Sequence, residues 1–184
     1  YLYRMANPDL QPEKMMNYEL SAAKSFSRYF SAELTAYYSK GDNMIQTVDQ
    51  KNQNTGHFIN KGIELSARSH PFDNLWLTAT YSYLDTSLDN LVGAPKNQYY
   101  LGVDWKPWKF LGIGADLKGV GGLYVAETVR NQNYALLNLK VTWDICRYVS
   151  VFTRLENITD ARYTINRGYE MPGFTAMGGF KLRF

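Results

Sequence analysis

The chain has little of what many catalytic and metal-binding proteins use. Its 184 residues include one cysteine, Cys146, and two histidines, His57 and His70. A single cysteine excludes an internal disulfide and a zinc site built from several cysteines. Neither histidine has an obvious nucleophile and acidic partner, so we expect no catalytic residue, no metal ligand and no cofactor. Cys146 itself is expected to be a small, half-buried residue at a tight turn.

Long apolar runs and clustered charge are also absent. No stretch approaches the roughly 18 to 20 consecutive apolar residues of a membrane-spanning helix, so a β-barrel is the one remaining way to cross a bilayer. The net charge is only +3 and the basic residues are scattered, so no nucleic-acid partner is expected. The chain starts with Tyr1 and shows no signal peptide, and we expect it to be a piece or a processed form of something longer.

Aromatic residues and a two-residue periodicity are abundant. Aromatics make up 15% of the chain and include 15 tyrosines. Apolar and polar side chains alternate in many segments, which predicts β-strands with one apolar face each and very little helix. We expect nine strands, at residues 14–25, 29–41, 55–68, 74–86, 96–106, 110–121, 132–145, 148–158 and 173–184.

The connections between these strands alternate in length. Those after the first, third, fifth and seventh strands are short, and the other four are long. This alternation is typical of outer-membrane barrels, which have short periplasmic turns and long extracellular loops. The aromatic residues follow the same rule, because many tyrosines fall near the long loops and all four tryptophans near the short turns. Such sorting predicts two aromatic belts around an apolar band. The tryptophans are Trp76, Trp105, Trp108 and Trp143.

The last expected strand is amphipathic to its final residue. Phe180, Leu182 and Phe184 share one face, whereas Lys181 and Arg183 share the other. The apolar face suits lipid and the charged face suits a barrel lumen. Nine strands would place two parallel strands at the seam of a closed barrel, and a simple barrel needs an even count. We therefore expect the chain to be the last part of a bigger barrel, closing against strands that precede Tyr1.

Several short motifs, taken in order along the chain, resemble one family. They are residues 7–13 (NPDLQPE), 60–64 (NKGIE), 94–97 (APKN), 157–163 (NITDARY) and 169–174 (YEMPGF). Together they resemble the TonB-dependent outer-membrane receptors. We expect Pro8 and Pro12 to keep a loop segment extended and Gly62 to allow a close backbone approach. Asn157 and Asp160 are expected to hydrogen-bond their own backbone and so to set a turn.

This resemblance implies an all-β fold, an antiparallel transmembrane β-barrel wall. The chain would be the carboxyl-terminal section, residues 1–184, of a barrel of about 22 strands whose plug domain lies outside this chain. It implies TonB-dependent uptake of a scarce nutrient (an iron–siderophore, haem, cobalamin or a glycan) across the outer membrane of a Gram-negative bacterium. The implied partners are the outer-membrane lipid bilayer, the barrel-assembly machinery, which would read Phe184 as its signal, and the inner-membrane TonB complex acting through the plug. A surface lipoprotein partner is left open.

Ligand contacts are expected in the long loops, which are rich in tyrosine, arginine and amide side chains. The candidates are Tyr124, Arg130, Tyr163, Arg167 and Tyr169. Other interpretations stay open at this point. The main alternative is a passive outer-membrane porin or adhesin barrel; an outer-membrane hydrolase and a soluble small-ligand barrel of the lipocalin type are less favoured.

Overall fold

The computed structural model describes residues 5–126 and 132–184, and these residues form strands and loops without a helix. Nine strands make one antiparallel sheet in the order β1-β2-β5-β6-β7-β8-β9-β10-β13. Their bounds are β1 (Lys14–Ser27), β2 (Phe30–Asp42), β5 (His57–Phe72), β6 (Leu75–Thr86), β7 (Asn97–Trp108), β8 (Leu111–Leu123), β9 (Gln132–Cys146), β10 (Val149–Glu156) and β13 (Thr175–Leu182). Two small hairpins lie in loops, β3 (Ile45–Val48) with β4 (Lys51–Asn54), and β11 (Thr164–Asn166) with β12 (Tyr169–Glu170).

The nine expected strands are confirmed, with their ends displaced by four residues or fewer. The two hairpins were not expected, because their sequences lack the apolar alternation that marks the other strands. Among residues 5–126 and 132–184 there is no helix long and apolar enough to span a membrane.

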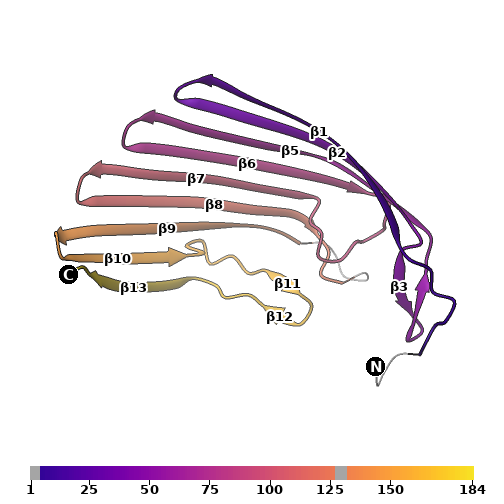
Figure 1. Cartoon of the computed structure of the whole chain (residues 1–184). Helices are drawn as coiled ribbons and strands as arrows, with labels where there is room; N and C mark the ends of the chain where they lie inside the picture. The colour runs from indigo at the N-terminus through magenta and orange to yellow at the C-terminus, as the bar shows by residue number, and fades with distance from the viewer. Residues whose placement is uncertain (1–4, 127–131) are drawn as a thin grey trace.

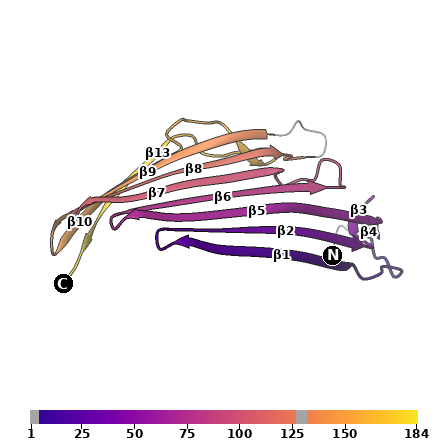
Figure 2. The same cartoon turned by 90° about the horizontal axis from the view of Figure 1, so that it is seen from above.

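The sheet is a single curved layer, as two perpendicular views show (Figures 1 and 2). Each strand pairs with its neighbours in sequence order, and β1 and β13 form the two edges. In the part of the chain that the structure describes, the sheet does not close on itself. This arrangement is a section of a barrel wall rather than a complete barrel.

The two ends of the sheet differ in their connections. At one end, where Figure 1 also places the carboxyl terminus, four turns of two residues join the strands, and each lies beside a shift in strand register. At the other end the connections are long, which confirms the expected alternation. The described residues with a positive φ all lie at this long-loop end, where the chain turns sharply. They are Asn43, Asp49, Gln50, Asn90, Asn157, Asp160, Gly56, Gly93, Gly122 and Gly168.

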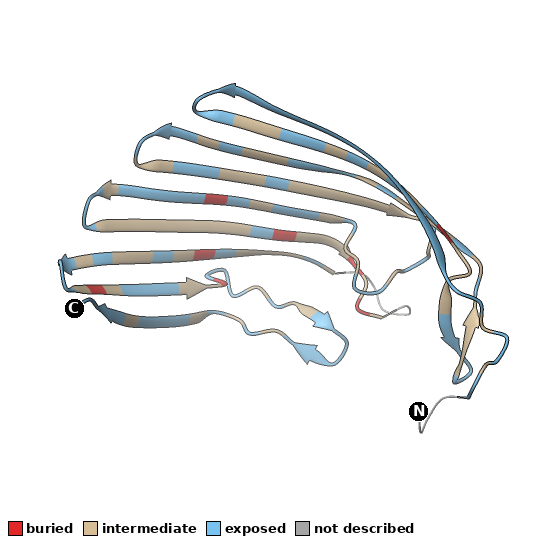
Figure 3. Ribbon diagram, in the orientation of Figure 1, coloured by how far each residue is buried: buried red, intermediate tan, exposed pale blue. Residues whose placement is uncertain are grey.

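One face of the sheet, which we call the outward face, is lined by apolar side chains. Rows of them cross from strand to strand, for example Leu101 opposite Leu117, which in turn lies opposite Leu137. Figure 3 shows buried residues only as isolated patches, and among the described residues only Leu123 and Val125 are buried apolar side chains. A single layer has no second layer to cover this face, so the apolar side chains stay exposed and need an apolar environment such as lipid.

The other face, which we call the inward face, carries the polar and charged side chains. The last strand follows this division, because Phe180 pairs with Val151 and points outward, whereas Lys181 pairs with Ser150 and points inward. Just beyond β13, Arg183 forms an ion pair with Asp144 of β9 at 3.4 Å. The predicted division of the carboxyl-terminal residues between the two faces therefore agrees with the structure.

Three local expectations have different outcomes. Gly62 does allow a close approach, since a Cβ there would overlap the carbonyl oxygen of Tyr83. Pro8, by contrast, is not extended but lies in a turn in which the Leu10 N–H donates to the carbonyl of Asn7. Cys146 is exposed rather than half-buried, because it ends β9 at the rim of the sheet.

Candidate functional site

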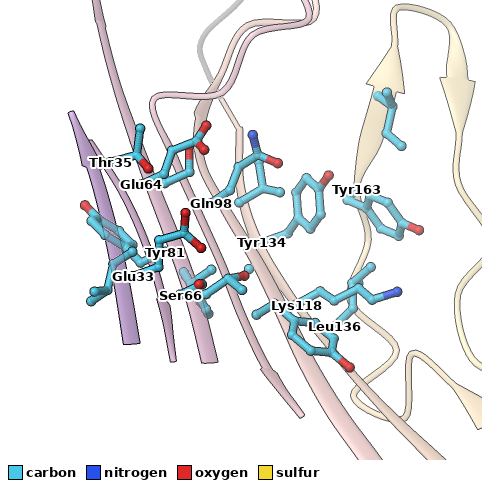
Figure 4. Close-up of a pocket in the computed structure, with 18 residues that line it drawn as sticks. Glu33, Thr35, Glu64, Ser66, Tyr81, Gln98, Lys118, Tyr134, Leu136 and Tyr163 are labelled. Atoms are coloured by element: carbon cyan, nitrogen blue, oxygen red, sulfur yellow. The ribbon is translucent and has the colours of Figure 1, made fainter. Parts of the chain in front are cut away.

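The inward face is hollowed where the middle strands curve around a loop. The hollow has a volume of about 740 Å³ and is lined by residues of β2, β5, β6, β7, β8 and β9 together with Tyr163 and Ile165. Figure 4 shows these side chains, with Glu33, Glu64, Tyr134 and Tyr163 among the labelled ones. The strands supply a rigid wall, and the loop between β10 and β13 supplies one side.

The wall of the hollow has an acidic part and a basic part. Glu33 of β2 and Glu64 of β5 are diagonal neighbours, because Glu33 pairs with Ser66 and Thr35 pairs with Glu64. Lys118 of β8 lies opposite Tyr100 of β7, three strands away from Glu64. A ligand in the hollow would meet carboxylates on one side and an ammonium with a phenol on the other.

Two tyrosines form the aromatic side of the hollow. The rings of Tyr134, at the start of β9, and Tyr163, in the loop, have centroids 4.5 Å apart and planes tilted by 34°. Next to this pair, the Thr164 N–H donates to Oε1 of Gln132 at 2.9 Å. The loop is therefore fastened to the loop end of β9, and Figure 4 shows its Tyr163 side by side with Tyr134.

Asn157 holds the base of this loop. Its side-chain oxygen accepts from the Ala161 N–H at 2.9 Å, and its amide group donates to the carbonyls of Ala161 and Pro172 at 2.9 and 3.3 Å. Only 4% of Asn157 is exposed, and its φ of 50° lies in the left-handed region that asparagine tolerates better than most residues. The expectation that Asn157 bonds its own backbone to set a turn agrees with this geometry.

A chain of hydrogen bonds connects Asn157 to the wall. The Asn157 backbone N–H donates to Oδ1 of the buried Asn138 on β9, and Asn138 Nδ2 donates to Asp116 Oδ2 on β8, at 2.9 and 2.7 Å. These partners satisfy polar groups that would otherwise be costly to bury. The loop therefore begins from a fixed point on the inward face.

Asp160 acts over a longer distance than expected. Its carboxylate accepts from the backbone N–H of Phe174 at 2.8 Å, fourteen residues along the chain, and so joins the two ends of the loop. A Cβ on Gly173 would overlap Oδ1 of Asp160, so only glycine leaves room for this contact. The prediction that the Asp160 side chain bonds the neighbouring backbone was wrong, because sequence spacing does not reveal which distant backbone group a loop brings near.

The loop between β2 and β5 is held by the segment that precedes β1. The Gln11 N–H donates to Oδ1 of Asn54 at 2.9 Å, and Asn54 Nδ2 donates back to the carbonyl of Gln11 at 2.9 Å and to that of Asn43 at 2.8 Å. Asn7 Nδ2 also donates to the carbonyl of Asn52 at 2.7 Å. The motif at residues 7–13 is therefore a clasp on the neighbouring loop.

The candidate ligand residues lie in different places. Tyr163 lines the hollow, whereas Tyr169, 74% exposed, lies on β12 of the hairpin whose turn contains the exposed Arg167. Tyr124 lies beside a second hollow, and its carbonyl accepts from the Gly93 N–H. Arg130 lies outside the described residues. The structure thus brings only Tyr163 of this set to the main hollow, and ligand contact by any of them stays a prediction.

Sequence reasoning did not select the wall residues of the hollow as ligand candidates. They are Glu33, Glu64, Tyr100, Lys118 and Tyr134. Their signal is present in the sequence, because each falls on an inward position of its strand. What the sequence does not show is which inward positions the curvature of the sheet gathers around one loop. The described residues contain no group of three or more histidine, cysteine or acidic side chains arranged to hold a metal ion.

The fold defines a section of membrane β-barrel wall, apolar outside and polar inside, with loops at one end. Residues 1–158 match the family described as TonB dependent receptor-like, beta-barrel. The chain therefore belongs to the TonB-dependent receptors, which are transport proteins and not enzymes.

Curated and solved relatives agree with this assignment. The chain is 27% identical over 183 residues to the Vitamin B12 transporter BtuB of Photobacterium profundum, covering 90% of this chain and 29% of that protein. Its fold is similar to the Copper transporter OprC, with a TM-score of 0.80 and 16% identity over 99% of this chain and 34% of that chain. It is equally similar to the siderophore receptor PiuA from Acinetobacter baumannii, with a TM-score of 0.80 and 18% identity over 96% of this chain and 30% of that chain. The chain thus spans about a third of the length of these relatives.

Proposed function

We propose that this chain forms the carboxyl-terminal part of the barrel wall, and the associated extracellular loops, of an outer-membrane receptor that takes up a scarce nutrient with energy from the TonB complex. The observation that carries the proposal is the family match over residues 1–158, on a sheet whose outward face is apolar and whose inward face is polar. The plug and the remaining strands would come from other parts of the receptor. The passive porin or adhesin alternative is not favoured by these relatives.

The nutrient would be a siderophore-bound iron, haem, cobalamin or a glycan. The names of the relatives include a vitamin B12 transporter, a copper transporter and siderophore receptors, so they do not select one of these. The hollow supports a ligand with both aromatic and polar parts, because Tyr134 and Tyr163 present rings while Glu33 and Lys118 present charges of both signs.

The test uses a bacterial strain that lacks its own receptors and expresses the complete protein. Its growth is measured with each nutrient class in turn as the sole source. Growth on one class that requires TonB supports the proposal. Growth without TonB would instead indicate a passive pore. The location is tested separately by fractionation, where the protein must be found with the outer membrane.

A pair of variants tests whether the hollow takes part. We expect Tyr163→Ala to weaken binding of the nutrient, because it removes a ring that lines the hollow, whereas Tyr169→Ala, on the exposed hairpin, leaves binding nearly unchanged. Binding is measured by titration of the purified complete receptor. An equal effect of the two variants would indicate that the ligand binds the outer surface of the loops rather than the hollow.

The terminal Phe184 has its own test. We propose that it is the signal read by the barrel-assembly machinery, since it is an exposed aromatic residue two positions beyond β13, the last strand of the sheet. Phe184→Ala is expected to lower the amount of assembled receptor in the outer membrane several-fold, as measured by heat-modifiable mobility on gels. A Phe180→Ala variant is the matched control, because it removes the same ring from within β13.

A further inference from the structure

Three lysines form a row on the outward face at the long-loop end of the sheet. They are Lys14 of β1, Lys40 of β2 and Lys61 of β5, on three adjacent strands. Lys14 pairs with Asp42 and Met16 pairs with Lys40, so Lys14 and Lys40 are diagonal neighbours. Lys40 pairs with Ile59, which makes Lys61 its next diagonal neighbour. Diagonal neighbours across strands lie about 7–8 Å apart, so the two outer lysines of the row are about 15 Å apart, a span that flexible lysine side chains and a headgroup with more than one phosphate can bridge.

The row lies at the height where a membrane interface is expected. Lys40 is ten positions from Phe30 on β2, about 34 Å along the strand. A strand tilt of roughly 40° reduces this to about 26 Å across the membrane, similar to the apolar band of a barrel of about 25 Å. Beside the row, the rings of Tyr18 and Tyr38 face outward with centroids 6.5 Å apart, and Tyr38 pairs directly with Lys61. Tyrosine rings of this kind mark the boundary between hydrocarbon and headgroups.

The ammonium groups of the row differ in their partners. Lys61 forms an exposed ion pair with Asp85 at 3.3 Å. Asp42, the nearest other carboxylate in the register, is bonded to His57 Nδ1 at 2.5 Å. The ammonium groups of Lys14 and Lys40 form no ion pair or hydrogen bond with another described residue. Two free ammonium groups and a third that is partly paired therefore point toward the lipid side of the wall.

We propose that this row binds the phosphorylated headgroup of a glycolipid in the outer leaflet of the outer membrane. The argument is charge complementarity, since lysines at a membrane surface attract anionic headgroups and a phosphate satisfies ammonium donors. Lipid binding by this row is a role separate from nutrient uptake, although it rests on the proposed outer-membrane location. Bound glycolipid would anchor the wall beside the loop formed by β3 and β4, which continues directly from β2.

The test uses the complete receptor, released from outer membranes in mild detergent and examined by native mass spectrometry. The probe is lipid A in its phosphorylated form, added back at known concentration. A variant with Lys14→Gln, Lys40→Gln and Lys61→Gln is expected to bind lipid A about 100-fold more weakly, because each basic residue near an anionic surface contributes roughly five-fold. The matched control replaces three inward lysines, Lys106, Lys140 and Lys181, and is expected to bind as the parent does.

Two further arms identify what is bound. Enzymatically dephosphorylated lipid A is expected to bind the parent receptor as weakly as phosphorylated lipid A binds the triple variant. Phosphatidylglycerol is expected to compete poorly with lipid A for the parent receptor. Equal binding of lipid A by the parent and the triple variant overturns the proposal, as does an equal loss in the inward control. Equal binding of the dephosphorylated lipid also overturns it, because acyl contacts would then explain the affinity.

Assembly and nutrient uptake of each variant are measured as well, so that failure to assemble is not mistaken for loss of lipid binding. Where the triple variant does not assemble, Lys40→Glu alone places a carboxylate in the middle of the row and is expected to weaken lipid A binding in the same way. Lys24→Gln is its control, since Lys24 also faces outward on β1 but lies about 34 Å from Lys14 along the strand. Loss of lipid A binding in these variants with normal uptake supports the lipid site and leaves the proposed function unaffected. Absence of the parent protein from the outer membrane would contradict the proposed function.

Discussion

Two loops of this protein contain a hairpin, and they are held in place in different ways. The loop with β3 and β4 is clasped from outside by residues 5–13, through exposed or half-buried hydrogen bonds such as those of Asn54. The loop with β11 and β12 is anchored to the inward wall through the buried residues Asn157 and Asn138. Because buried hydrogen bonds cost more to break than exposed ones, the second loop is expected to be the more rigid.

The largest effect is expected from Asn157→Ala. This change removes three side-chain hydrogen bonds from a residue that is 4% exposed, leaves partly buried backbone groups of Ala161 and Pro172 without these partners and places alanine at a φ of 50°. We expect the loop to be destabilised by about 3 kcal/mol, a rise of roughly 100-fold in the open population. Tryptic cleavage after Arg162 in the complete receptor measures that population. Asn166→Ala, on the exposed hairpin, is the control, and similar cleavage of both variants would show that Asn157 is no anchor.

A smaller effect is expected from Asn54→Ala. The side chain also makes three hydrogen bonds, but water replaces them more easily at this half-buried position. A loss of about 1.5 kcal/mol would raise cleavage after Lys51 roughly ten-fold. Gln53→Ala keeps the clasp and serves as the control. If Asn54→Ala increased cleavage of its loop more than Asn157→Ala does, the loop with β3 and β4 would be the more strongly held of the two.

Gln132→Ala sharpens the account of the anchored loop. It removes a single hydrogen bond, the one that Gln132 accepts from the Thr164 N–H. We expect the closed state of the loop to lose about 0.7 kcal/mol of stability, with roughly three-fold faster cleavage after Arg162. An effect as large as that of Asn157→Ala would place the main anchor at the Tyr134–Tyr163 end of the loop.

The smallest expected quantity is the coupling between the two loops. Asn54 and Asn157 share no hydrogen-bond partner among the described residues, so their effects should add to within about 0.5 kcal/mol in the double variant. The cleavage rates of the single and double variants supply this number. A larger coupling would mean that the two loops open together as one unit.

Much of the wall could be predicted from the sequence. The alternation of side chains located all nine strands and assigned Phe180 and Lys181 to opposite faces. The motifs identified the family, which the match over residues 1–158 confirms. The two hairpins could not be predicted in the same way, because β3 has one apolar residue on each face, Ile45 and Val48, and β4 has none, so neither strand shows a periodic signal.

The sequence by itself determined the strands, their faces and the alternation of short turns with long loops, because these follow from a local period of two residues. Only the tertiary structure decided which loop residues meet which wall residues. Tyr163 reaches Tyr134, Asp160 reaches Phe174 and Gln11 reaches Asn54 through side-chain and ring contacts between distant segments. Such contacts depend on the curvature of the sheet and on backbone turns at residues like Asn157, and neither leaves a periodic pattern in the chain.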